Sequence, residues 1–375
     1  AYDHELADGL KLSTRLNYKL QQPWHNRNPE LDPVSNYNFY DKVAQRSTAR
    51  VGLTWDVTDA VHLMVGGEFN YDHGNAEWMP EERYFGYTDP TVEYLSAAAL
   101  AEAMVETDWV NITAGARFEA HSQFGSAFVP RIGLTKVLNP FHFKLMLSRA
   151  YRAPMIENMA LSPDVKPELI DVGELEVGYQ LNRSMLLTAS IFDITLHQPI
   201  VYVWDPVTLT ESYQNQESTG TRGAEIEYRY QGEFGYAIVG YSFYTAAGKP
   251  RIDWNRVPHR GDMTLAFPKH KLTLMGSANI TRDFSINPSV VFMSKRFGNV
   301  TSDDAGVPVV GEYPAVTLVN VFLQYRNAFT PGLDIGLGVN NLLNADAAII
   351  QAYRGTKAPY PGLSREAQVR LSWSY

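Results

Sequence analysis

The chain has 375 residues and no cysteine, which excludes disulfides and thiolate chemistry. Its formal net charge of −9 offers no basic patch for a nucleic acid. Its 46 aromatic residues (22 Tyr, 17 Phe, 7 Trp) are many for a soluble enzyme, and a hydrophobic fraction of 45% accompanies a mildly polar mean hydropathy of −0.24. This combination indicates alternating apolar and polar residues. No run of about 18 apolar residues predicts a transmembrane helix.

A period of two predicts strands along almost the whole chain. The first strand is expected near residues 9–20. In residues 108–120, the apolar face comprises Val110, Ile112, Ala114, Ala116 and Phe118. The opposite, polar face comprises Asn111, Thr113, Gly115, Arg117 and Glu119. The same alternation recurs in residues 271–280 and 332–340. In the last segment, residues 365–375, the apolar face comprises Ala367, Val369, Leu371, Trp373 and Tyr375.

The length of these strands separates a membrane protein from a soluble sandwich. Many run to about ten residues, the length that a tilted transmembrane strand needs, whereas strands of soluble domains usually have about five or six. Small polar residues dominate the polar faces, which suits a wet or plugged lumen better than a packed core. We expect an all-β fold, a transmembrane antiparallel β-barrel with about sixteen strands in this chain.

The predicted connections alternate in length. Short turns are expected at residues 58–59, 107–108, 139–140, 182–183, 231–232, 282–283 and 329–332. Longer segments are expected at residues 21–44, 72–90, 151–168, 198–216, 246–267, 298–313 and 345–362, and a short connection at 121–126 falls on their side. Short periplasmic turns and long extracellular loops are typical of outer-membrane barrels. An even strand count places the start of the first strand and the end of the last one in the periplasm.

Six segments, in order along the chain, resemble motifs of the TonB-dependent outer-membrane receptors. They are SRAYRAP (148–154), LSPDVKPE (161–168), ELEVG (174–178), GTRGAEIEY (220–228), PKHKL (268–272) and VNNLLN (339–344). The resemblance covers nearly the whole chain, so residues 1–375 are expected to form one outer-membrane barrel domain. Barrels of this family have about 22 strands. We therefore expect a C-terminal part of such a barrel, without its plug domain and TonB box; a self-contained barrel of about sixteen strands is the alternative.

Structural roles are expected for most of these motif residues. Arg152 and Glu168 bracket a long loop and are expected to tie its base together. Asn340, Asn341 and Asn344 fit a strand end that turns into a loop. Val369, Leu371, Trp373 and Tyr375 resemble the terminal signal that the barrel-assembly machinery reads in this class of protein.

The resemblance implies active uptake of a scarce nutrient across the outer membrane of a Gram-negative bacterium, with a ferric siderophore as the favoured ligand. The implied partners are the TonB–ExbB–ExbD complex, the barrel-assembly machinery and the lipid bilayer, with no nucleic acid and no cofactor. A passive porin-like channel and a loop-displaying structural or adhesion barrel are the alternatives. Residues 155–161 contain no His, which lowers the heme interpretation. No metal-ligand or nucleophile motif predicts an enzyme.

Aromatic and cationic side chains of the long loops suit an anionic ligand through stacking and charge attraction. The candidate ligand-binding residues are Trp24, His25, Trp78, Tyr84, Tyr87, Arg152, Tyr202, Trp204, Tyr213, Arg260, Tyr353, Arg354 and Lys357. The competing interpretation assigns many of these aromatic residues to loop packing or to the aromatic girdle of the membrane interface.

Overall fold

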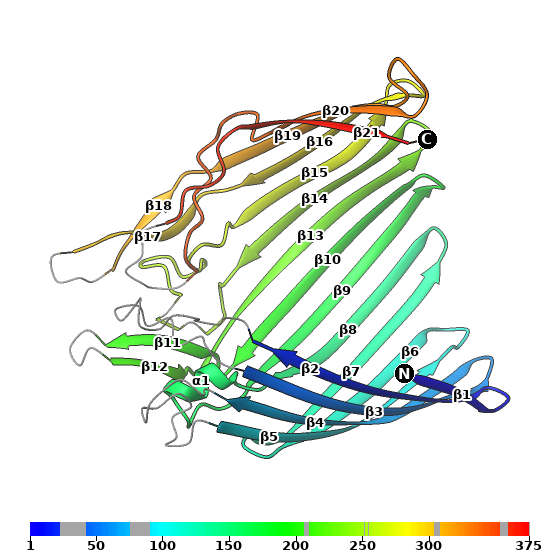
Figure 1. The fold of residues 1–375 in the computed structure, drawn as a ribbon, viewed down its shortest axis with the longest axis vertical. Coiled ribbons are helices and arrows are strands. Elements are labelled where there is room, and N and C mark those ends of the chain that lie inside the picture. Colours follow the sequence, from blue (N-terminus) through cyan, green and yellow to red (C-terminus); the bar gives the residue numbers. More distant parts are fainter. Residues whose placement is uncertain are drawn as a thin grey trace. The chain divides into compact units, whose positions relative to one another are not determined.

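The computed structural model describes residues 1–22, 43–75, 91–205, 210–250, 252–253, 255–303, 308–352 and 359–374. Its strands form one sheet of 17 strands and two sheets of two strands each (Figure 1). The strand pairs β2–β3, β13–β14 and β20–β21 of the large sheet are antiparallel. Within the described residues, no helix is long and apolar enough to cross a membrane.

The chain divides into two compact units. The first comprises Ala1–Lys136, Met146–Gly173 and Thr195–Ser218, and the second comprises Val137–Leu145, Glu174–Ile194 and Thr219–Tyr375. In chain order the elements up to the middle of the chain are β1 (Tyr2–Ala7), β2 (Leu10–Gln21), β3 (Val43–Thr58), β4 (Val61–Asn75), β5 (Thr91–Val105), β6 (Asn111–His121), β7 (Gly125–Leu138), β8 (Phe141–Arg152), α1 (Ile156–Leu161), β9 (Glu168–Asn182), β10 (Met185–His197), β11 (Ile200–Asp205) and β12 (Thr210–Asn215).

The remaining elements all lie in the second unit, apart from the first residue of β13. They are β13 (Ser218–Gly232), β14 (Gly235–Thr245), β15 (His270–Asn279), β16 (Phe284–Met293), β17 (Arg296–Ser302), β18 (Pro308–Tyr313), β19 (Val316–Tyr325), β20 (Leu333–Asn340) and β21 (Glu366–Trp373). Strands that follow one another in the chain pair with each other from β13 to β16 and from β19 to β21. β16 pairs directly with β19, and the β17–β18 hairpin, which separates them in the chain, forms a sheet of its own.

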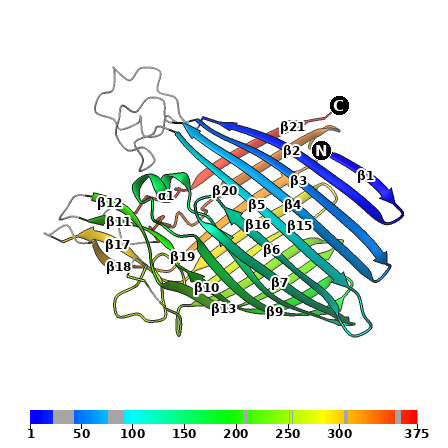
Figure 2. The ribbon, with the colours of Figure 1, turned by 90° about the horizontal axis from the view of Figure 1, so that it is seen from below.

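Strand register explains why each strand has two chemically different faces. In the first unit, β2 to β7 pair in chain order, as the second view also shows for β2, β3 and β4 (Figure 2). Apolar side chains gather on one face and remain exposed there: Leu16 is 80% exposed and Phe128, opposite Phe118, is 59% exposed. Exposed apolar rows of this kind suit contact with lipid.

The last strand has the polarity expected from its sequence. Val369 lies opposite Leu337 and is 70% exposed, and Leu371 and Trp373 are exposed on the same face. All seven expected turns lie within two residues of observed ones. The turns expected at 58–59 and 182–183 are shifted by one residue, and the one expected at 231–232 is shifted by two, because Gly232 still pairs with Gly235 and the turn follows at residues 233–234.

The strand count differs from the expectation of about sixteen because β1 precedes the first expected strand. A tight turn at Asp8–Gly9, with φ +70° at Gly9, returns the chain into β2. Two segments expected as loops contain hairpins of their own, β11–β12 and β17–β18. The expected loop 151–168 contains the short helix α1.

Two small apolar clusters hold the connecting segments. In the first unit, Val92 and Tyr94 of β5 pack with Met159 of α1 and with Val165, which follows that helix. In the second unit, Val257, Met263 and Leu265 pack with Phe297 of β17. These segments therefore have buried cores and are anchored to strand ends.

Asn341 forms the corner at the end of β20, as its position in the VNNLLN segment predicts. It has φ +47° and is 4% exposed. Its Nδ2 donates to the carbonyls of Ala345 (2.9 Å) and Leu363 (2.9 Å), and its Oδ1 accepts from the Ala345 amide (2.8 Å). Asn344 also has a positive φ, and its Oδ1 accepts from the Arg365 amide (3.0 Å). The structural role expected for these two residues is confirmed.

The two faces of β21 generate a first prediction. A charged Val369→Arg side chain enters the lipid-facing row, and we expect a loss of roughly 2–4 kcal/mol in the free energy of unfolding. The matched control is the adjacent Gln368→Arg on the polar face, expected to cost much less. Urea unfolding of the protein in lipid vesicles measures both. Equal losses for the two variants would contradict the assignment of the faces.

A second prediction concerns the corner at Asn341. Asn341→Ala removes three hydrogen bonds, each worth about 0.5–1.5 kcal/mol, so we expect a loss of roughly 2–4 kcal/mol in unfolding free energy. Asn341→Gly loses the same bonds but tolerates the positive φ, and is expected to be less destabilised by about 1 kcal/mol. Asn344→Ala, which removes one such bond, serves as the control and is expected to cost less than either, as measured by the same unfolding assay.

Candidate functional site

A network of ion pairs crosses strands β3 to β6 on the polar face of the first unit. Arg46 binds Asp72 with 2.6 Å between Nε and Oδ1. Farther along the same strands, Glu68 accepts hydrogen bonds from Arg50 and from Arg117, the latter at 3.1 Å. Both carboxylates of β4, Asp72 and Glu68, are therefore met by a guanidinium of another strand.

The alternation of the sequence builds this network directly. Arg46 lies opposite Asp72 and Arg50 opposite Glu68 in the β3–β4 register. Because side chains of one face recur at every second residue, a charge at each of these positions meets an opposite charge across the strand pair. Arg117 and Glu119 were predicted on the polar face of β6, and they bind each other there at 3.0 Å.

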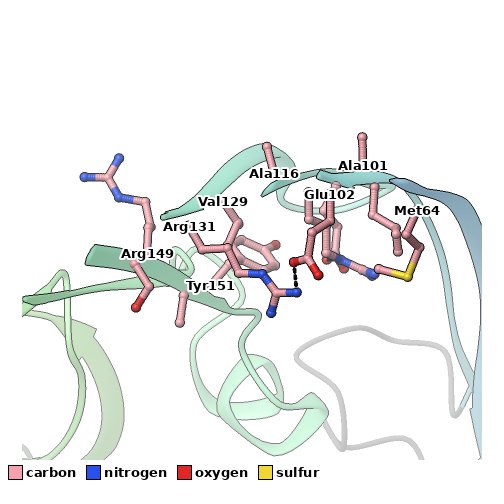
Figure 3. A pocket seen from close by; sticks show the side chains of 13 residues that line it. Met64, Ala101, Glu102, Ala116, Val129, Arg131, Arg149 and Tyr151 are labelled. Atoms are coloured by element: carbon pink, nitrogen blue, oxygen red, sulfur yellow. Dashed lines mark hydrogen bonds and ion pairs between the residues drawn. The ribbon is translucent and has the colours of Figure 1, made fainter. Parts of the chain in front are cut away.

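A cavity of about 480 Å³ opens on this network. Strands β4 to β8 line it through Met64, Leu100, Ala101, Glu102, Ala116, Arg117, Glu119, Val129, Arg131, Ser148, Arg149, Ala150 and Tyr151. Figure 3 shows Glu102 of β5 and Arg131 of β7 pointing toward one another as an ion pair, with Tyr151 close by. The cavity wall is thus a mixture of paired charges and apolar patches.

Beside the cavity, β8 and β9 carry two further ion pairs of the first unit. Arg149 makes a bidentate pair with Asp171, at 2.7 and 2.8 Å, and His197 approaches the same carboxylate at 3.0 Å. Arg152 binds Glu168 at 2.5 Å. The bidentate geometry fixes both partners in orientation as well as in charge.

The expected link between Arg152 and Glu168 at the base of their loop is confirmed. Glu168 is only 4% exposed, and its other oxygen accepts from the Ile200 amide at 2.6 Å. The carboxylate thus joins β8, β9 and the start of the β11–β12 hairpin. Arg152, proposed from sequence as a ligand contact, is occupied by this structural bond.

Three other candidate ligand residues lie in the described part of the chain with their side chains. Tyr202 and Tyr213 face each other across the β11–β12 hairpin, with ring centroids 5.7 Å apart. Tyr213 also packs against the Tyr94–Met159 cluster, which favours the loop-packing interpretation for this residue. Arg260 lies in the second unit, with its guanidinium 5.8 Å from the ring centroid of Phe297.

The other candidates are not tested by the structure. Trp204 belongs to β11. The candidates that lie outside the described ranges are Trp24, His25, Trp78, Tyr84, Tyr87, Tyr353, Arg354, Lys357 and, in the terminal signal, Tyr375. The structure adds residues that were not singled out from sequence, above all Glu68, Glu102 and Arg131. Their signal was a charge at a polar position of an alternating strand.

No cluster of three potential metal ligands occurs among the described residues. The paired charges of the cavity hold one another and leave no arrangement that resembles a nucleophile with its base.

A comparison with protein families gives one match, to the family described as "TonB dependent receptor-like, beta-barrel", over residues 1–342. The chain belongs to this family. The family resemblance and the transmembrane β-barrel fold expected from sequence are confirmed by this match and by the solved structures below. No curated protein matched the sequence closely enough to count as a relative.

Solved structures with the same fold include a siderophore receptor, an iron transporter and a ferric-catecholate import receptor. The siderophore receptor PirA from Acinetobacter baumannii is 14% identical, with a TM-score of 0.69 over 98% of this chain and 59% of that one. The FrpB iron transporter from Neisseria meningitidis is 13% identical, with a TM-score of 0.71 over 97% and 60%. The ferric-catecholate import receptor Fiu from E. coli K12 is 15% identical, with a TM-score of 0.69 over 99% and 62%. The chain thus spans about three-fifths of these receptors.

The pairing of Arg152 with Glu168 gives a third prediction. Arg152→Met leaves a buried carboxylate with one donor, and we expect the loops at residues 151–168 and 198–216 to lose about 1.5–3 kcal/mol of local stability. Hydrogen exchange and limited proteolysis of these segments measure the change. Arg149→Met, which removes a half-exposed pair on the same strand, is the control. Unchanged protection in Arg152→Met would favour a ligand contact over a structural tie.

Proposed function

We propose that this TonB-dependent receptor barrel takes up an anionic ferric siderophore across the outer membrane of a Gram-negative bacterium. The observation that carries the proposal is the match to the receptor family over residues 1–342, together with the fold shared with a siderophore receptor, an iron transporter and a ferric-catecholate import receptor. The chain functions as a receptor and not as an enzyme. In the complete protein, a plug domain closes the lumen and TonB with ExbB–ExbD supplies the energy that moves it.

The chemistry of the two faces supports this proposal. The exposed apolar rows of β2, β7 and β21 suit lipid, while the ion-paired face of β3 to β6 suits the polar lumen of an outer-membrane barrel. Paired charges keep that lumen hydrated without a strong field of one sign. The terminal row Val369, Leu371 and Trp373 offers the assembly machinery an apolar strand edge.

The loop side supports an anionic ligand. Arg256, His259 and Arg260 gather in one turn around a cavity of about 410 Å³ in the second unit. In the first unit, taken by itself, Tyr202 presents a partly exposed aromatic ring. Aromatic rings and guanidinium groups are suited to the catecholate or carboxylate groups that wrap ferric iron.

Uptake by the complete protein provides the fourth prediction. Deletion of the gene is expected to abolish the uptake of radioactive iron from at least one ferric siderophore of a panel, with growth lost in iron-limited medium when that siderophore is the iron source. Complementation by the intact gene restores uptake, and deletion of the tonB gene abolishes it again because TonB supplies the energy.

Two results would contradict the proposal. Uptake that persists without TonB, combined with ion conductance by this protein in planar bilayers, would indicate the passive channel. Wild-type uptake of every ferric siderophore in the deletion strain would point to another nutrient or to a role in adhesion.

A further inference from the structure

The β17–β18 hairpin lies between β16 and β19 in the chain (Figure 1). Its first residue, Arg296, is a buried cation. Its residue exposure is 8%, and it lies opposite Tyr313 in the β17–β18 register. Burial lowers the pKa of the guanidinium from its ordinary value. An arginine with this perturbation still remains protonated at neutral pH, so the site holds a positive charge.

Within the described residues, this guanidinium has neither an ion pair nor a hydrogen bond. Its Nε is sealed from solvent without an acceptor. Two carboxylates of neighbouring segments are paired with lysines: Glu312 binds Lys295 at 3.0 Å, and Asp262 binds Lys269 at 2.7 Å. The Tyr313 hydroxyl, on the strand opposite Arg296, donates to the Asn299 carbonyl at 2.8 Å.

The site around Arg296 is built by close packing. A Cβ atom at the next residue on the same face, Gly298, would clash with the side chain of Ile350 and lie 3.3 Å from Tyr313, so the segment at Ile350 lies directly on β17. On the other face, Phe297 packs into the cluster with Val257 and Leu265. Both faces of β17 are thereby fixed, and the stem of Arg296 cannot swing out to solvent without breaking this packing.

A buried charge without a partner costs several kcal/mol, and arginine cannot remove that cost by losing its proton. The terminal nitrogens of Arg296 are not among the atoms sealed from solvent, so an acceptor from solution can reach them. The planar fork of a guanidinium matches the two oxygens of a carboxylate or a phosphate.

We propose that Arg296 is the cationic contact of a preformed site for one oxyanion, a carboxylate or phosphate group supplied by a small molecule. The site is distinct from the cavity between β4 and β8, and the inference does not depend on the nutrient that the receptor carries. A bound oxyanion would compensate the positive charge of Arg296 and hold the β17–β18 hairpin against the segment at Ile350.

The fifth prediction tests this site in the purified protein in detergent. Inorganic phosphate or acetate, added at constant ionic strength against chloride, is expected to raise the Tm of the wild type in a saturable way, because an anion that binds only the folded state stabilises it. Arg296→Met is expected to lose this response and, without oxyanion, to be at least as stable as the wild type. The control is Arg282→Met in the exposed turn before β16, which is expected to respond like the wild type.

The two anions distinguish the source of the oxyanion. Saturation by phosphate, by acetate or by both supports the site and states its ligand class. Titration calorimetry of the wild type with each anion gives a second measurement that does not need the variant to fold. Arg296→Lys, which keeps the charge without the fork, is expected to weaken binding by roughly tenfold or more. No saturable binding of either anion to the wild type, or an equal Tm response in Arg296→Met, would overturn the proposal.

Discussion

The absence of water in the hydrocarbon layer is the constraint on which the structure depends, because every backbone amide and carbonyl there must find its partner within the protein. Long antiparallel strands satisfy this demand: β3, β4 and β5 have 15 or 16 residues each and pair along almost their whole length, with one register shift between Asp56 and Thr58. Once the ladder is fixed, each residue faces either lipid or the polar side. A shift of one residue would exchange the two faces.

The polar face answers the same constraint with side chains. A charge on a strand beside a low-dielectric layer is tolerable when an opposite charge lies across the pair, and Glu68 has two such partners. Surface ion pairs add little stability in water, so the network is better understood as a means of keeping charged groups on this face without net charge. It leaves a polar wall with defined hydrogen-bond directions, which suits a wet lumen.

The faces and turns of the strands were predictable from sequence because they depend on local alternation. The row Val369, Leu371 and Trp373 and the corner at Asn341 were both expected, and both are observed. The hairpins β11–β12 and β17–β18 were missed, because a short strand within a long connection carries few alternating residues and the distance to its partner is not visible in a single sequence. The ion-pair partners were missed for a related reason: Arg117 meets Glu68 only through a register that places β4, β5 and β6 side by side.

Arg152 and Arg296 show how the same residue type divides between structure and function. Both stand where a strand meets a connecting segment, and both are held by close packing or by strong bonds. Arg152 forms an ion pair with Glu168, a buried carboxylate of its own chain, and this pair holds the base of a loop. Arg296 is more deeply buried and meets no acid among the described residues. Since evolution of a stable fold favours the replacement of an unpaired buried charge by an apolar side chain of similar size, a guanidinium retained in this position is best explained by a ligand that completes it.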